Sequence, residues 1–251
     1  MRVFIIVVIS FIIFPFLLYS SQQINISSKY KTLGNNRKKI ISSEQQKLIK
    51  AQKWLKSINY NRTPEQIKTM TMLRLQMYGK FNGISTQTLI SNANLVNLQV
   101  MKKLEVLTLP TWTSNQGLSN IKDLNYLSTL NVPKCNISDA GMVYLKNKPE
   151  MKSLVLAGDN ITDAGLNNLS GMNQLQILNL SGTKITDVGM KTISNFTSLR
   201  KLFLNRTDIT DACIPDITKL TNLNRIDITG TKITQQGKDQ IKKDIPGIKI
   251  Y

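Results

Sequence analysis

The chain has 251 residues, 41% of them hydrophobic, which is enough for one elongated domain with a substantial core and a leader. It has no histidine, which excludes Ser-His-Asp and Cys-His catalytic arrangements and removes the commonest metal ligand. The formal net charge of +18 is uneven, with +11 in residues 1–79 and +7 in residues 80–251. This excess favours anionic partners such as an envelope surface, unless it marks only a solvated basic linker.

Residues 1–21 are expected to form an export signal. Arg2 is followed by an uncharged apolar run from Val3 to Tyr19, the pattern of a signal peptide. The run is also at the lower length limit for a membrane-spanning helix, so an uncleaved N-terminal anchor is the alternative. We therefore expect a secreted or periplasmic protein, or one anchored by this segment and facing outside the cytoplasm. Nucleic acid is a poor partner for an exported chain.

Residues 22–42 are polar and basic and predict a flexible linker. Residues 43–79 predict a helical cap with helices over 43–58 and 64–78. Ser43 with Gln46 suggests a capping box at the first helix, and Thr63 with Pro64 marks the start of the second. Because a solenoid needs its end covered, this pair is expected to cap the segment that starts at residue 80. A separate adaptor module is the alternative.

Residues 80–251 contain an internal repeat of about seven units. Hexapeptides of the type NITDAG begin at residues 136, 160, 184, 208 and 232, in steps of 24. Apolar residues two apart recur with the same step, at Leu154, Leu156, Leu178, Leu180, Leu202, Leu204, Ile226 and Ile228. This spacing predicts a short strand, and the apolar residues recurring every three positions after it predict a short helix. Such units bury their apolar faces only when they are stacked.

The pattern L-x-x-L-x-L-x-x-(N/C/T)-x-L resembles the leucine-rich repeat, and its TDAGL style looks like bacterial members of that family. It is also similar to the ribonuclease-inhibitor-like and cysteine-containing subclasses. The resemblance implies an α/β leucine-rich repeat solenoid, with parallel strands on a concave face and short helices on the convex face. It further implies a surface that binds macromolecules and has no chemistry of its own, so we expect no enzyme, cofactor or metal.

Three columns of residues recur with the repeat. An aspartate column could bind Ca²⁺ but is better explained as helix capping behind the preceding Ser or Thr; its members are Asp139, Asp163, Asp187 and Asp211. A second column is expected to bond loop backbone, and its members are Cys135, Asp159, Thr183, Thr207 and Thr231. Cys135 and Cys213 lie three units apart, about 14 Å, which is too far for a disulfide.

The solvent-facing strand positions supply the candidate binding site. In the C-terminal half they bring together an aromatic side chain with basic ones, the composition of a contact hot spot; the candidates are Ile177, Asn179, Lys201, Phe203, Arg206, Arg225 and Asp227. The leading hypothesis is a non-enzymatic module that recognises a protein partner on the concave face. The alternatives are a structural envelope protein tethered by its basic N-terminus and a substrate-receptor subunit of a ubiquitin ligase.

Overall fold

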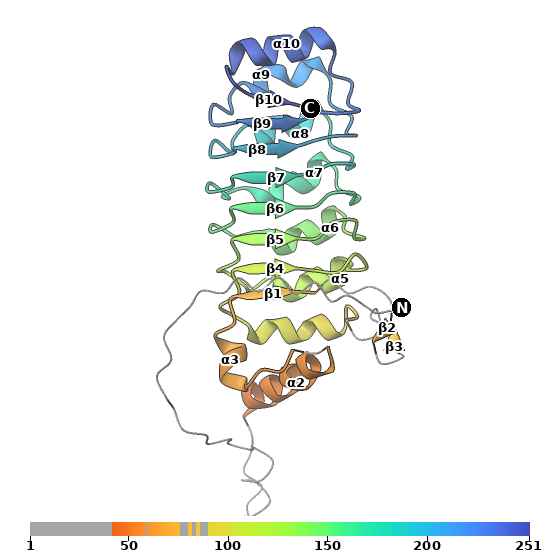
Figure 1. The fold of residues 1–251 in the computed structure, drawn as a ribbon, viewed down its shortest axis with the longest axis vertical. Helices are drawn as coiled ribbons and strands as arrows, with labels where there is room; N and C mark the ends of the chain where they lie inside the picture. Colours follow the sequence, from red (N-terminus) through yellow and green to blue (C-terminus); the bar gives the residue numbers. More distant parts are fainter. Residues whose placement is uncertain (1–41, 59, 76–79, 82–83, 86–89) are drawn as a thin grey trace, which may run out of the picture.

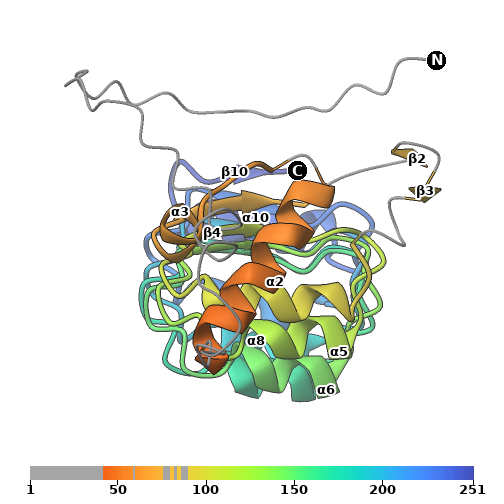
Figure 2. The ribbon, with the colours of Figure 1, turned by 90° about the horizontal axis from the view of Figure 1, so that it is seen from below.

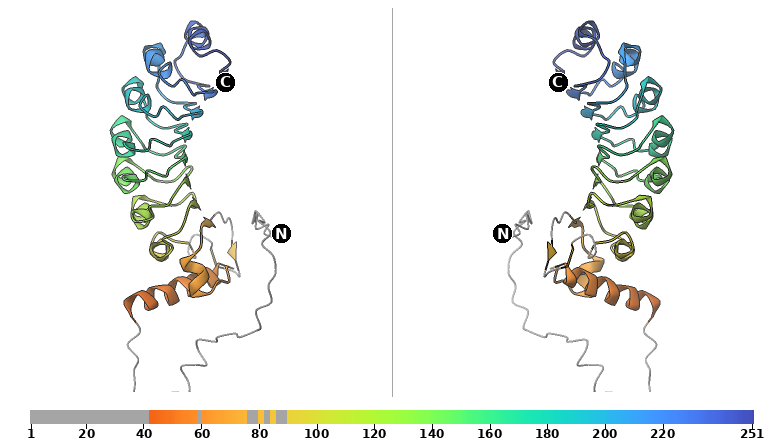
Figure 3. Two further views of the ribbon diagram at one scale, coloured as in Figure 1. Left: turned by 90° about the vertical axis from the view of Figure 1, so that its left-hand side faces the viewer. Right: turned by 90° about the vertical axis from the view of Figure 1, so that its right-hand side faces the viewer.

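A computed structural model describes residues 42–58, 60–75, 80–81, 84–85 and 90–251. They form a curved solenoid with strands along its inner face and helices along its outer face (Figures 1 and 3). The leader predicted for residues 1–21 and nearly all of the linker predicted for 22–42 lie outside the described residues. Within the described ranges, no helix has the length and apolar character needed to cross a membrane.

A parallel sheet of eight strands runs the length of the solenoid in the order β1-β4-β5-β6-β7-β8-β9-β10. The strands are β1 (Met72–Arg74), β4 (Val106–Thr108), β5 (Thr129–Asn131), β6 (Ser153–Val155), β7 (Ile177–Asn179), β8 (Lys201–Phe203), β9 (Arg225–Asp227) and β10 (Lys249–Ile250). The central residue of each three-residue strand is buried, and its flanking side chains mostly face the concave side. Leu154, Leu178 and Leu202 pair directly across neighbouring strands, which confirms the predicted core ladder.

Short helices cover the other side of the sheet. They are η1 (Asn94–Val100), α5 (Asn115–Leu118), η2 (Ser119–Ile121), α6 (Asp139–Met142), η3 (Val143–Leu145), α7 (Asp163–Leu166), η4 (Asn167–Leu169), α8 (Asp187–Ile193), η5 (Asp211–Cys213), α9 (Ile214–Ile217) and α10 (Gln235–Asp244). Met190, Ile193 and Phe196 are buried between units, as their spacing of three predicts. Separately, β2 (Lys80–Phe81) and β3 (Ile84–Ser85) form an antiparallel pair.

Helix α2 (Ser43–Ser57) lies across the N-terminal end of the solenoid and packs against η1 (Figure 2). Its buried side chains, among them Ala51 and Leu55, belong to the same hydrophobic core as the repeats. The predicted capping box at Ser43 and Gln46 is wrong by one residue. Ser42 Oγ accepts from the Gln45 backbone N–H at 3.2 Å, and the Gln45 side chain accepts from the Ser42 N–H at 3.0 Å.

The second predicted helix, over 64–78, is wrong beyond its first turns. Helix α3 (Pro64–Lys68) begins as expected, with Thr63 as its N-cap, but it ends at Lys68. Leu73 and Leu75 are then both buried with an exposed arginine between them, a period of two that suits a strand. Leu73 pairs with Leu107 of β4, so the sheet begins at Met72, ahead of the predicted boundary at 80.

Candidate functional site

Two rows of side chains line the concave face. The first residue of each strand forms one row: Met72, Val106, Thr129, Ser153, Ile177, Lys201, Arg225 and Lys249. The third forms the other, which the residue after β10 extends: Arg74, Thr108, Asn131, Val155, Asn179, Phe203, Asp227 and Tyr251. From β4 to β7 both rows are uncharged, and from β8 onward they are mostly basic and aromatic. The face therefore has two chemically distinct parts.

The structure brings six of the seven predicted site residues into these rows. Ile177 pairs with Lys201 and Lys201 with Arg225, while Asn179 pairs with Phe203 and Phe203 with Asp227. Phe203 is half-buried on the concave face and does not belong to the core. The seventh, Arg206, lies in the loop beyond β8 with φ of 57° and an exposed side chain.

Arg225 is the centre of this region. Its guanidinium carbon lies 5.3 Å from the centroid of the Phe203 ring and 4.4 Å from that of the Tyr251 ring. Both distances are within the range of a cation–π contact. The arginine, on β9, is thereby held between Phe203 of the neighbouring strand β8 and Tyr251, which directly follows the other neighbouring strand, β10.

Sequence reasoning missed Lys249 and Tyr251. They lie one 24-residue step after Arg225 and Asp227, so extending the register by one unit finds both. We call the resulting set the C-terminal patch: Lys201, Phe203, Arg225, Asp227, Lys249 and Tyr251. Tyr251 is 50% exposed, which gives the patch an aromatic ring open to solvent.

The chain offers little counter-charge to this patch. All 15 Asp and Glu residues of the chain are among the described residues. The ion pairs of the described residues are Lys102–Asp123, Lys219–Asp216 and Lys232–Asp208, and none of them lies on the patch. Asp227 is the one acidic residue of the patch, and its Oδ1 accepts a hydrogen bond from the Thr229 N–H at 3.1 Å.

Family models and the fold of a solved structure agree with this architecture. Models described as leucine-rich repeat match residues 149–209 and 123–146. The fold is a leucine-rich repeat solenoid. An internalin from Listeria monocytogenes superposes with a TM-score of 0.58 and 17% sequence identity, over 76% of this chain and 51% of the internalin. A leucine-rich repeat protein of Leptospira interrogans matches with a TM-score of 0.45 and 22% identity, over 62% and 50% of the two chains.

This chain therefore spans about half the length of both solved proteins. At these identities the likeness concerns the fold. No curated protein matches the sequence. Leucine-rich repeats commonly form protein-binding modules and are generally non-catalytic scaffolds.

The aspartate column joins each repeat to the next. As predicted, the Thr186 side chain caps its own helix by accepting from the Val188 N–H. Asp163 of the preceding repeat accepts from the Thr186 N–H at 2.9 Å and from its hydroxyl at 2.6 Å. Asp139, Asp187 and Asp211 each accept the same pair of hydrogen bonds from the threonine of the next repeat. Among the described residues, no acidic or cysteine cluster could hold a metal ion.

Glycine makes room for the aspartate of the preceding repeat at most of these positions. A Cβ on Gly189 would lie 2.3 Å from Asp163 Oδ1, closer than any real contact. Cys213 occupies the equivalent position one repeat later, and there the outer segment begins as the 3-10 turn η5 instead of an α-helix. Cys213 and Cys135 are both buried and free.

The turn column bonds backbone as predicted, with the threonines as donors and Asp159 as an acceptor. Thr183, Thr207 and Thr231 donate their hydroxyl hydrogens to backbone carbonyls three residues earlier, at 2.6, 2.6 and 2.7 Å. Asp159 is 3% exposed, and its Oδ1 accepts from the Ile137 N–H at 3.3 Å. Its Oδ2 has no hydrogen-bond partner among the described residues. Burial raises the pKa of this carboxyl to about 8, against the lowering effect of hydrogen bonds from backbone N–H groups.

Lys148 is a buried charge that sequence reasoning missed. It stands one 24-residue step before Met172 and two before Phe196, both in the core, yet it is itself 1% exposed. Its Nζ donates to the Lys122 carbonyl at 2.6 Å. Burial lowers its pKa, with a smaller opposing effect from Asp123. A lysine at an apolar repeat position is the signal that would have found it.

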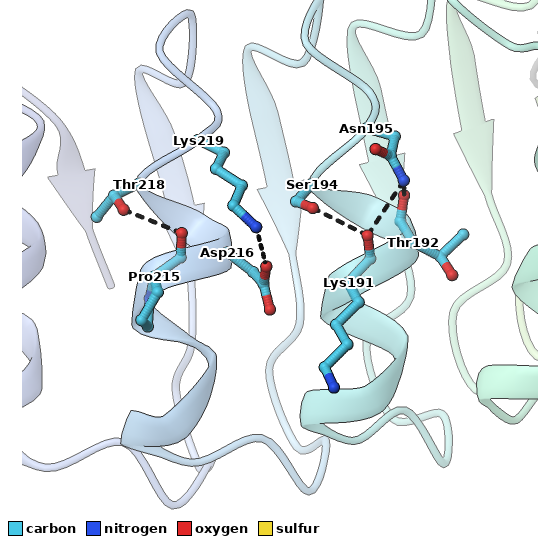
Figure 4. A network of polar contacts seen from close by, with 8 residues as sticks. All are labelled: Lys191, Thr192, Ser194, Asn195, Pro215, Asp216, Thr218 and Lys219. Atoms are coloured by element: carbon cyan, nitrogen blue, oxygen red, sulfur yellow. Dashed lines mark hydrogen bonds and ion pairs between the residues drawn. The ribbon is translucent and has the colours of Figure 1, made fainter.

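The polar side chains at the ends of α8 and α9 form only local contacts (Figure 4). Ser194 and Asn195 donate to the Lys191 carbonyl, and Thr218 donates to the Pro215 carbonyl. These bonds satisfy backbone oxygens that a helix end leaves unpaired. This part of the convex face therefore has a structural explanation, and the concave face remains the candidate for binding.

Proposed function

We propose that this chain is a non-enzymatic binding module that recognises a protein partner on its concave face and works outside the cytoplasm. The observation that supports binding is the position of Arg225, which lies between Phe203 and Tyr251 on the concave face. Arg225 takes part in none of the ion pairs of the described residues. Arginine and aromatic residues are the types that contribute most to protein interfaces. The apolar run after Arg2 supports export.

The arrangement suits recognition better than chemistry. The strand side chains hold fixed positions because each strand from β4 to β9 pairs with two neighbours and β10 pairs with β9, so a partner meets a pre-organised surface. Ile177 on β7 adjoins the C-terminal patch, Val155 lies one strand further away on β6, and both are half-buried. A partner can therefore bury apolar surface over β6 and β7 while it makes polar contacts over β8 to β10.

Site-specific cross-linking in the native cells tests the proposal. A photo-reactive benzoylphenylalanine replaces Ile177 in the full chain, and in a control replaces Val188, which is 62% exposed at the start of α8. We expect a discrete protein adduct from position 177 and none from position 188. Adding Phe203→Ala and Arg225→Ala should abolish that adduct while the circular dichroism spectrum is unchanged.

Equal adducts from both positions, or an adduct that survives the double substitution, would refute the site. Capture that ignores both substitutions but falls steeply with ionic strength would indicate tethering through the basic N-terminal residues. Fractionation of the same cells tests the proposed location, because a cytoplasmic chain contradicts it.

A further inference from the structure

The C-terminal patch places three cations in direct register. Lys201 pairs with Arg225, and Arg225 pairs with Lys249. Strands in a sheet are about 4.8 Å apart, and like charges directly opposite each other destabilise the pairing. None of the ion pairs among the described residues involves these three side chains. Packing alone therefore does not account for this row.

The guanidinium of Arg225 is oriented but not neutralised. The two flanking rings hold it in place. Its Nε is buried and has no acceptor among the described residues, so a ligand has to approach through the terminal N–H groups. A planar guanidinium with fixed orientation matches a carboxylate, which can accept two of its N–H groups side by side. Because the side chain is already ordered, binding loses less conformational entropy there.

The uncharged strands β5 to β7 of the concave face favour a ligand that carries its charge at one end only. Thr129, Ser153, Val155 and Ile177 present uncharged side chains along β5 to β7. A polyanion with charge along its whole length would find no cation over these strands. A peptide segment with acidic residues at one end and small apolar residues along the remainder matches both parts of the face.

The chain itself does not supply that segment. Residues 22–42 contain five Lys or Arg and no Asp or Glu, so their charge has the wrong sign. A second copy of this chain, with its formal charge of +18, is repelled by the same patch.

We infer that the C-terminal patch binds an acidic segment of the protein partner, with a carboxylate on Arg225 flanked by Lys201 and Lys249. This rests on the proposed function, because it names the chemistry of the partner that the concave face would recognise. Phe203 and Tyr251 serve as positioning residues for Arg225 and as apolar contacts at the same point.

The test uses random peptides of about 12 residues displayed on phage and selected against the full chain. At about 3.3 Å per residue, such a peptide is long enough to cross all eight strands. Selected peptides are resynthesised with Asn and Gln in place of Asp and Glu. We expect enrichment of acidic residues among the selected peptides, and at least ~10-fold weaker binding by the amide versions.

Matched variants locate the binding. Arg225→Lys keeps the charge but removes the planar fork, so it should weaken the acidic peptides nearly as much as Arg225→Ala. Val188→Ala, on the convex side, should change nothing. Unchanged melting temperatures exclude misfolding as the cause. Heparin serves as the polyanion probe.

The outcomes separate the two proposals. Selected peptides that lack acidic residues but depend on Phe203 would overturn the acidic partner and leave the proposed function standing. Heparin binding that depends on Arg225, together with peptides that bind equally well in their amide versions, would overturn the acidic protein segment in favour of a polyanion. If no peptide binds above the level of the Phe203→Ala, Arg225→Ala double variant, both proposals fail.

Discussion

Asp159 should make the stability of the solenoid depend on pH. The carboxyl is 3% exposed, one of its oxygens has no hydrogen-bond partner in the part of the chain that the structure describes, and burial raises its pKa to about 8. In the unfolded chain its pKa is about 3.9. Between these values the folded state binds one more proton than the unfolded state, so stability falls as pH rises through this window. The carboxyl is neutral and harmless at about pH 4 and destabilises fully above about pH 8.

The magnitude is set by the two pKa values. At about 1.4 kcal/mol for each pKa unit, the full separation corresponds to about 6 kcal/mol. Buried sites relax and admit water around a charge, which reduces this cost. We expect Asp159→Asn, which keeps an acceptor for the Ile137 N–H, to raise the free energy of unfolding by about 2–5 kcal/mol at pH 8.5 and by about 0–1 kcal/mol at pH 4.5.

Urea unfolding of both proteins at pH 4.5, 6.5 and 8.5 measures this difference. The matched control is Glu150→Gln, an exposed carboxyl of the repeat before, whose effect should stay within about 0.5 kcal/mol throughout. A difference between Asp159→Asn and the wild type that does not change with pH would show that the carboxyl is ionised in the folded protein, and the reasoning would be wrong.

Two further substitutions test the contacts between repeats. Gly189→Ala places a Cβ 2.3 Å from Asp163 Oδ1 and should destabilise by about 2–4 kcal/mol through loss of charge-assisted bonds; Val188→Ala, its exposed neighbour, should change stability by less than about 0.5 kcal/mol. A Gly189→Ala protein as stable as the wild type in urea would contradict this close approach. Lys148→Met should stabilise by about 1–3 kcal/mol near neutral pH, because it removes a buried charge from a core position. That gain in stability should shrink as pH rises toward about 10.4, where the lysine of the unfolded chain also loses its proton. Thermal melts of both proteins at pH 7 and pH 10 measure the gain, and an equal gain at both pH values would contradict the prediction.

The strands from β5 onward could be predicted because one residue pattern fixes both pairing and burial. Leu178 and Leu202 are 24 residues apart and directly paired, so the period in the sequence is the period of the sheet. β1 could not be found in this way. Leu73 pairs with Leu107, and this separation is longer than a repeat. The alternating burial in β1 follows directly after residues that favour a helix, and Pro64 does start one. The sequence pattern therefore predicts that this helix continues through β1.

The aspartate column illustrates a contact that a single unit does not reveal. Asp163 satisfies the helix-capping pattern of its own repeat, which explains why capping was predicted. Its two hydrogen bonds, however, go to Thr186 of the next repeat. Only the stacking of repeats brings these groups together, and the glycine at 189 that makes room for the carboxylate comes from that next repeat as well.

Part of the candidate site could also be predicted from register alone. Lys201, Phe203 and Arg225 were placed on the concave face because solvent-facing strand positions alternate with core leucines. The stacking of Arg225 between two rings could not be predicted, since it depends on side-chain conformations. Tyr251 was accessible to the same reasoning and was missed because the register was not carried into the last strand.

The identical joints between repeats have a consequence for engineering. Each joint consists of hydrogen bonds from a threonine to the aspartate 23 residues before it, and these joints recur through the span from Asp139 to Thr234. A whole 24-residue module can therefore be inserted or removed within this span while every joint keeps its partners. Such a change would move the cationic end of the concave face toward or away from the N-terminal helices by about 4.8 Å per module. The solenoid would then act as an adjustable molecular ruler, able to report how long a ligand's neutral stretch must be.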